Sequence, residues 1–156
     1  MRLSKEYIEA NKKAYDELAE EYATRDYTVQ NDFYKTQVFA DLDFAKGKRI
    51  LEIGPGRGAR LKNFLSYGMD VTAIELSAEM CKLCSSIAPE ARIINKNVLD
   101  CEFSEPFDYI YMEAVIHNFP KEEASKVLDV VASWLKDGGI FICTTTGLMS
   151  IHGTQK

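Results

Sequence analysis

The chain has 156 residues, of which 46% are hydrophobic and 28% charged, and its formal net charge is −5. This length and composition are typical of a single globular domain with a sizeable core. The negative charge and the lack of a basic stripe argue against a nucleic-acid partner. No apolar run approaches the roughly 18 residues of a membrane span, so no membrane partner is expected. The N-terminus shows no secretion signal, which predicts a cytoplasmic protein with free thiols.

Helices and strands are expected to alternate along the chain. Apolar side chains spaced by three and four predict a helix over residues 5–23, and a second helical stretch follows at 32–45. The expected strands cover residues 49–54, 70–76, 91–99, 107–113 and 140–146. The expected helices between them cover residues 59–67, 77–88 and 121–137, and the last carries a core stripe of Val127, Leu128, Val131 and Leu135. This alternation indicates βαβ units and an α/β fold with a doubly wound parallel sheet.

The run RILEIGPGRGARL, residues 49–61, has three glycines at every second position between an expected strand and an expected helix. Glycine costs backbone entropy in such a segment, so a ligand is expected to approach the main chain there. The turn also lies at the ligand-binding edge of a doubly wound sheet. Gly54, Gly56 and Ala59 fit the loose dinucleotide pattern as well. Glu52 disfavours that alternative, because a carboxylate repels a pyrophosphate but attracts an ammonium group.

Glu75 ends the second expected strand, about twenty residues beyond the turn, where an acid can accept both hydroxyls of a ribose. Glu52 and Glu75 together suit a ligand that has an ammonium group and a ribose but no phosphate. S-adenosylmethionine is such a ligand.

Five segments, in the right order, resemble the motifs of class I S-adenosylmethionine-dependent methyltransferases of the small-molecule type. They are ILEIGPGRG, VTAIELSAEM, NVLDCEF, FDYIYMEAVIHNF and LKDGGIFICTTT, and AYDELAEEY resembles the lead-in helix of the family. The resemblance implies a Rossmann-like parallel sheet of order 3-2-1-4-5 after N-terminal helices. It also implies a single domain over 1–156, with a helical lead-in or lid at 1–45, a core at 46–146 and a tail at 147–156. Strands 6 and 7 of the family are expected to be absent.

The same resemblance implies roles for single residues. The cofactor-binding residues would be Glu52, Gly54, Gly56 and Met112 for the methionine part, Glu75 for the ribose, and Leu76, Asp100 and Cys101 for the adenine. Tyr15 and Tyr22 lie seven residues apart on one helical face and could close over the sulfonium, since aromatic faces attract cations. Core packing explains this pair of tyrosines equally well.

Two residues are candidates for catalysis. His117 follows the fourth expected strand and could act as a general base, or it could only cap or pack. Glu113 occupies a position that is more often small or polar in the family, near where acceptors bind. The expected function is methyl transfer from S-adenosylmethionine to a small molecule, with S-adenosylhomocysteine as product and in-line positioning as the main catalytic effect. A cofactor-binding module without turnover is the alternative, and a dinucleotide oxidoreductase is less favoured.

The cysteines and the fifth strand carry two further expectations. Cys81 and Cys84 share the C-x-x-C spacing but lack a clear partner set, so buried thiols are favoured and no metal site is expected.

The strand at 140–146 would be an apolar sheet edge, which tends to pair with another chain. A homodimer, or the tail around 149–152, is expected to cover it.

Overall fold

A computed structural model describes residues 5–25 and 46–145 of the chain. Its helices are α1 (Lys5–Thr24), α3 (Ala59–Ser66), α4 (Ala78–Ile87) and α5 (Lys121–Ser133), with 3-10 turns η2 (Val98–Asp100) and η3 (Ile116–Asn118). Its strands are β1 (Arg49–Ile53), β2 (Asp70–Glu75), β3 (Arg92–Asn95), β4 (Phe107–Glu113) and β5 (Leu135–Thr144). The helix expected at 32–45 and the tail around 149–152 lie outside the described residues.

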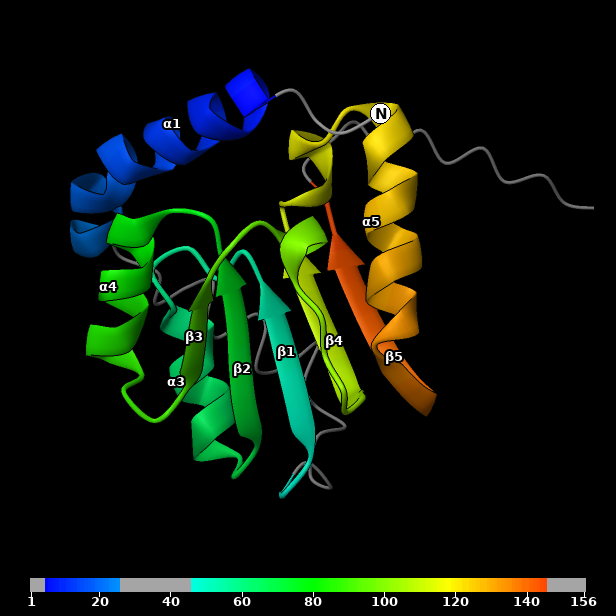
Figure 1. Cartoon of the computed structure of the whole chain (residues 1–156). Coiled ribbons are helices and arrows are strands. Elements are labelled where there is room, and N and C mark those ends of the chain that lie inside the picture. Colours follow the sequence, from blue (N-terminus) through cyan, green and yellow to red (C-terminus); the bar gives the residue numbers. More distant parts are fainter. Residues whose placement is uncertain (1–4, 26–45, 146–156) are drawn as a thin grey trace, which may run out of the picture.

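The five strands form one parallel sheet in the order β3-β2-β1-β4-β5, which confirms the predicted topology (Figure 1). All strands point the same way, and α1 lies across the end of the sheet at which β2 and β3 finish. Ligands of doubly wound sheets bind at this carboxyl edge. The fold therefore places α1 as a cover over the expected binding edge.

Side chains one residue apart on a strand enter opposite core layers. Ile50 of β1 packs with Phe64 of α3 and with Tyr111, whereas Leu51 packs with Val127 of α5. Since β-strand side chains alternate between the two faces, this assigns every position on β1 and β4 to a layer. Glu52, Tyr111 and Glu113 belong to the α3 face, and Met112 belongs to the α5 face.

Both helix boundaries around β2 show the usual chemistry of helix ends. Gly68 ends the segment after α3 with φ +73°, which is the conformation glycine adopts at little cost. Ser77 caps α4, because its Oγ accepts a hydrogen bond from the Met80 N–H at 3.1 Å.

The predicted boundaries of α5 and β5 were wrong. The helix ends at Ser133, and β5 begins at Leu135, so Gly138 and Gly139 lie inside the strand and do not terminate the helix. The register shifts between the Phe107–Leu135 pair and the next pair along, which marks an irregularity of the bulge type in which Gly138 takes φ +76°. Leu128 is 39% exposed and is not part of the core stripe, because it lies to one side of the buried Val127–Val131 line.

α1 is held at its middle by the N-terminus of α4. The Asp16 carboxylate accepts hydrogen bonds from the Ser77 hydroxyl at 2.5 Å and from the Glu79 N–H at 3.3 Å. Hydrogen bonds from Lys12 and Ser77 lower the pKa of Asp16 to about 2. A negative charge is favourable at this position, because the free N–H groups of a helix start attract it.

The two ends of α1 are held as well. Near its C-terminus, Arg57 donates to the carbonyl oxygens of Tyr22 and Ala23 at 3.5 and 3.4 Å. Near its N-terminus, the Tyr7 hydroxyl donates to the carbonyl of Asn118 in η3. α1 therefore spans from the glycine turn to the segment that follows β4.

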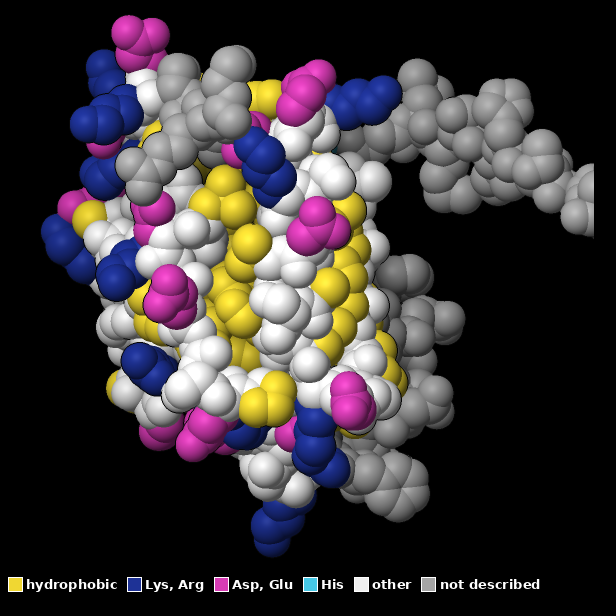
Figure 2. Space-filling model, turned by 45° about the vertical axis from the view of Figure 1, so that its right-hand side comes forward, with side chains coloured by type: hydrophobic (Ala, Val, Ile, Leu, Met, Phe, Trp, Pro, Cys, Tyr) yellow, Lys and Arg dark blue, Asp and Glu magenta, His cyan; other side chains and the backbone are white. Residues whose placement is uncertain are grey.

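Within the described residues, β5 is hydrogen-bonded to β4 alone and forms an edge of the sheet. Ile140 on this strand is 52% exposed. Figure 2, which brings this side of the molecule forward, shows hydrophobic side chains exposed in bands on the surface. None of the helices in residues 5–25 and 46–145 combines the length and apolarity that a membrane crossing requires.

Candidate functional site

A cavity of about 410 Å³ lies between α1, the carboxyl ends of β1, β2 and β4, and η3. Eight of the residues singled out from the sequence line it: Tyr15, Tyr22, Gly54, Gly56, Glu75, Leu76, Glu113 and His117. Four others do not line it: Glu52, Asp100, Cys101 and Met112. The cavity is also lined by residues that were not singled out from the sequence, among them Asn11, Arg57, Arg60, Lys96, Asn97, Val98, Val115 and Asn118.

The three glycines of the turn serve different purposes. A Cβ on Gly54 would lie 2.3 Å from Val115 Cγ2, and one on Gly58 would lie 3.0 Å from the Cα and Sγ of Cys84. These two glycines therefore make room for the protein's own atoms. A Cβ on Gly56 would meet nothing closer than the Tyr22 ring at 3.6 Å, so its main chain is the part of the turn that lies open beneath α1. All three have positive φ, between +56° and +85°.

Glu75 ends β2 with its carboxylate buried at the cavity wall. Its Oε1 accepts a hydrogen bond from the Ser77 N–H at 2.9 Å. Burial raises the pKa of Glu75 to about 7, and the N–H groups of Ser77 and Gly56 oppose that rise. Hydrogen bonds donated by the hydroxyls of a ligand would stabilise the ionised form of this buried carboxylate.

Glu52 is paired inside the protein. It is 1% exposed, and its Oε1 accepts a hydrogen bond from Arg60 Nε at 3.1 Å. Its Oε2 is buried and has no hydrogen-bond partner among the residues that the structure describes. Burial raises the pKa of Glu52, and the Arg60 guanidinium opposes the rise. The same guanidinium forms an ion pair with Glu113 and lies 4.8 Å from the centre of the Tyr111 ring.

Arg60 is the main site residue that the sequence analysis missed. It lies in the first turn of α3, two residues beyond the last glycine, where a side chain can reach back to the end of β1. In the folded sheet, the register of β1 and β4 and the alternation of side chains put Glu52 and Glu113 on the face that α3 covers. The cation at the start of α3 pairs with both acids there, and only the packing of α3 over these strands reveals this contact.

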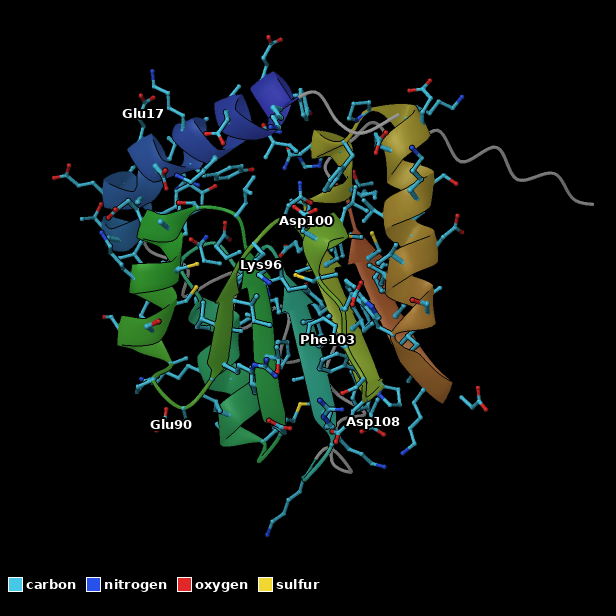
Figure 3. All side chains as sticks on the ribbon, in the orientation of Figure 1. Glu17, Glu90, Lys96, Asp100, Phe103 and Asp108 are labelled. Atoms are coloured by element: carbon cyan, nitrogen blue, oxygen red, sulfur yellow. The ribbon has the colours of Figure 1, made fainter. Side chains whose placement is uncertain are left out.

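In the segment that follows β3, the residues that line the cavity are not Asp100 and Cys101, which were expected to bind the cofactor. β3 ends at Asn95, and the Asn97 side chain then caps η2 by accepting from the Leu99 N–H at 2.9 Å. The cavity-facing part of this segment is consequently Lys96 to Val98. Figure 3 shows Lys96 and Asp100 at the α1 end of the sheet, with Glu90 and Asp108 at the opposite end. Asp100 is nevertheless exposed, away from the cavity lining.

The other two residues outside the lining are buried. Cys101 is held near the Asn97 carbonyl, with an Sγ to oxygen distance of 3.5 Å. Met112 faces the α5 layer, because it is one residue out of phase with Glu113 on β4. The binding roles predicted for Asp100, Cys101 and Met112 remain predictions.

The segment after β4 brings His117 and Asn118 to the cavity. Ala114 starts it with φ +53°, a conformation that non-glycine residues rarely adopt. The Asn118 side-chain amide donates to the Tyr15 hydroxyl at 3.2 Å, which joins η3 to α1. His117 is exposed and lines the cavity beside this contact.

The C-x-x-C thiols are part of the protein's packing. Cys84 is fully buried, and its Sγ donates to the Gly56 carbonyl at 3.1 Å, beneath the glycine turn. Burial raises the pKa of Cys81 to about 11 and raises that of Cys84 as well. Both groups are therefore protonated near neutral pH. In residues 5–25 and 46–145, no three His, Cys, Asp or Glu side chains gather in a way that could hold a metal ion.

Known proteins resemble this chain in sequence and in fold. A family model described as a methyltransferase domain matches residues 50–139. The ribosomal RNA small subunit methyltransferase A of Malacoplasma penetrans is 33% identical over 98 residues, which cover 63% of this chain and 36% of that protein. A ubiquinone biosynthesis O-methyltransferase of Xanthomonas oryzae pv. oryzae is 30% identical over 114 residues, which cover 69% of this chain and 46% of that protein. The solved DhpI–SAH complex has a TM-score of 0.75 at 19% identity, covering 90% of this chain and 70% of that one.

The chain belongs to the class I S-adenosylmethionine-dependent methyltransferases, a family of enzymes whose methyl donor is S-adenosylmethionine. The predicted family and the predicted sheet order are thereby confirmed. The chain spans 36% and 46% of the lengths of the two curated relatives named above.

Proposed function

We propose that this protein binds S-adenosylmethionine in the cavity under α1 and transfers its methyl group to a small-molecule acceptor. The observation that carries the proposal is the meeting of Gly56 and Glu75 in one cavity that α1 covers. Gly56 leaves open space beside the turn for a ligand to pack against the main chain, and Glu75 offers a buried carboxylate for the ribose hydroxyls. Leu76 and Val98 supply apolar walls that suit a purine ring.

When bound, the cofactor supplies a methyl group made electrophilic by the sulfonium. The task of the protein is then to hold an acceptor atom in line with that group, which accounts for much of the rate in such a reaction. An acceptor that must lose its proton needs a base, and His117 and Glu113 are the titratable side chains of the cavity near the end of β4. Tyr15 and Tyr22, on the face of α1 that lines the cavity, would exclude water and face the cation.

The acceptor is proposed to be small because α1 and η3 cover the cavity and are joined to each other through Tyr7, Tyr15 and Asn118. The similarity to a ribosomal RNA methyltransferase favours an RNA acceptor as the alternative. Transfer of labelled methyl groups to a small-metabolite fraction and to ribosomal RNA, assayed side by side, separates the two. Binding of the cofactor without transfer to either fraction would favour the non-catalytic module.

The affinity for S-adenosylhomocysteine should depend on pH through Glu75. Its pKa of about 7 means that it is mostly protonated at pH 6 and mostly ionised at pH 8. The ribose hydroxyls favour the ionised form, so binding releases a proton and affinity rises with pH, by up to about tenfold between pH 6 and pH 8.

Calorimetry of wild type and Glu75→Gln across this pH range checks that expectation. The variant should bind roughly ten- to a hundredfold more weakly at pH 8, because it loses hydrogen bonds to a charged acceptor. Its affinity should no longer follow the wild-type rise with pH. If the two proteins bind S-adenosylhomocysteine with equal affinity at pH 8, Glu75 does not bind the ribose.

We also propose that a second copy of the chain covers the β5 edge, where Ile140 is exposed. Apolar edges with open backbone groups favour strand pairing between chains. Light scattering at micromolar concentration should give the mass of a dimer, and Ile140→Lys should shift it toward that of a monomer. A wild-type monomer whose β5 amides exchange slowly would contradict this and leave a segment of the same chain as the cover.

A further inference from the structure

Charge is unevenly distributed along the cavity wall. The charged lining residues lie at the end of α1, in the glycine turn, at the start of α3 or at the carboxyl ends of β2, β3 and β4; they are Arg25, Arg57, Arg60, Glu75, Lys96 and Glu113. The other part of the wall, here called the η3 end, is formed by the lining residues of segments 7–15 in α1 and 115–119 around η3. Figure 1 shows the N-terminal end of α1 beside the segment between β4 and α5, which carries η3. No Asp, Glu, Lys or Arg is among the described lining residues of the η3 end.

The aromatic side chains of the η3 end present their rings to the cavity. The hydroxyl of Tyr7 donates to the carbonyl of Asn118, and the hydroxyl of Tyr15 accepts from the Asn118 side-chain amide at 3.2 Å. Both hydroxyls are thus engaged in joining α1 to η3. The side chain of Phe119, which also lines this end, has no polar atom. Aromatic rings pack well against another ring, so this wall favours an aromatic ligand.

Two polar side chains remain at the η3 end to orient such a ligand. They are Asn11 and His117, and neither side chain has a hydrogen-bond partner within residues 5–25 and 46–145. An amide and an imidazole can each exchange hydrogen bonds with a hydroxyl group. A carboxylate, phosphate or ammonium group would enter this end without an opposite charge, which is costly wherever water is excluded.

We propose that the η3 end takes an uncharged aromatic acceptor, a phenol whose hydroxyl receives the methyl group. This deepens the proposed function and rests on it. The phenol oxygen bonds to the methyl carbon as the carbon–sulfur bond of the sulfonium breaks, and the electron pair of that bond stays on sulfur. The hydroxyl proton passes to His117, which is exposed and returns it to solvent. An unpaired RNA base is also a neutral ring, but its phosphates would approach a chain of net charge −5, which favours the small molecule.

Three phenols of similar size test the charge of the acceptor. They are 4-methylphenol, which is uncharged, 4-hydroxybenzoate, which is anionic, and 4-(aminomethyl)phenol, which is cationic. Each is titrated at pH 8 into protein saturated with S-adenosylhomocysteine and followed by ligand-observed NMR. The uncharged phenol should bind at least about tenfold more tightly than either charged one, because their charged groups lose water without gaining a partner.

Two variants of Tyr7 separate its ring from its hydroxyl. Tyr7→Ala should weaken the binding of 4-methylphenol roughly five- to tenfold, because a ring contact is lost. Tyr7→Phe keeps the ring and should lose less. Leu128→Ala is the matched control, because Leu128 is 39% exposed and Tyr7 37%, but Leu128 does not line the cavity. It should leave the affinity unchanged, and thermal unfolding shows that each variant is folded.

A third variant supplies the charge that the η3 end lacks. Asn11→Lys should shift the preference toward 4-hydroxybenzoate by about tenfold, because the anionic group then gains a charge-assisted hydrogen bond.

Three results would overturn the proposal. They are binding of either charged phenol to wild type as tightly as 4-methylphenol, equal losses in Tyr7→Phe and Tyr7→Ala, and failure of all three phenols to bind to protein that holds S-adenosylhomocysteine. If S-adenosylhomocysteine itself does not bind, the proposed function fails, which is a different outcome from these three.

Discussion

Replacement of Arg60 by methionine is expected to lower the free energy of unfolding by about 3–5 kcal/mol at neutral pH. Methionine keeps much of the apolar volume of arginine but leaves Glu52, which is 1% exposed, without its cation. Removing one partner of a buried ion pair costs more than the pair contributes, because the other charge stays buried and uncompensated. Denaturant unfolding followed by circular dichroism measures the change.

Arg49 offers a matched control for this variant. Its guanidinium also lies 4.8 Å from an aromatic ring, that of Phe107, but its partners Asp70 and Glu105 are 65% and 75% exposed. Arg49→Met should therefore cost no more than about 1 kcal/mol. Adding Glu52→Gln to Arg60→Met should recover part of the stability, because the stranded charge is then gone. A loss in Arg60→Met as small as that in Arg49→Met would show that Glu52 does not depend on this ion pair.

Replacement of Gly54 by alanine should be nearly as damaging, with an expected loss of about 2–5 kcal/mol. One part of the loss arises from φ +68°, which costs an L-residue about 1–2 kcal/mol. The other part, about 1–3 kcal/mol, arises from overpacking, because the new Cβ would lie 2.3 Å from Val115 Cγ2. Relief of that contact would move the turn or Val115, both of which line the cavity, so affinity for S-adenosylhomocysteine should fall as well.

Gly47→Ala separates the two parts. Gly47 has φ +74°, but a Cβ there would meet no atom within 4 Å, so this variant should show the conformational cost alone. Val115→Ala added to Gly54→Ala should relieve the overpacking and restore some stability and binding. Equal losses in Gly54→Ala and Gly47→Ala would mean that the close approach of Val115 is not a constraint.

The sequence patterns predicted the sheet because each strand and helix carries its own signal. Five short apolar segments, the cap at Ser77 and the glycine at 68 agree with one another and with the observed order. The end of α5 was mistaken because Gly138 and Gly139 satisfy a bulge as well as a helix end. Both situations favour a residue that tolerates positive φ, so composition alone cannot separate them.

The site could be predicted where it depends on strand ends and not where it depends on side-chain pairing. Glu75 lines the cavity as expected from its position at the end of β2. Glu52 was placed at the end of β1, but its partner Arg60 lies eight residues further on, and that contact depends on how α3 packs over β1 and β4. The Lys96–Val98 segment depends on a single side-chain cap by Asn97, which the sequence does not distinguish from a continuing strand.

Binding of S-adenosylhomocysteine tests the central claim most directly. Calorimetry on one sample of the wild-type protein at pH 8, titrated in turn with S-adenosylhomocysteine, S-adenosylmethionine and NAD, should show one saturable site for the first two ligands and much weaker binding of NAD. If NAD binds more tightly than S-adenosylhomocysteine, the account is contradicted, and a dinucleotide is then favoured as the ligand of the glycine turn.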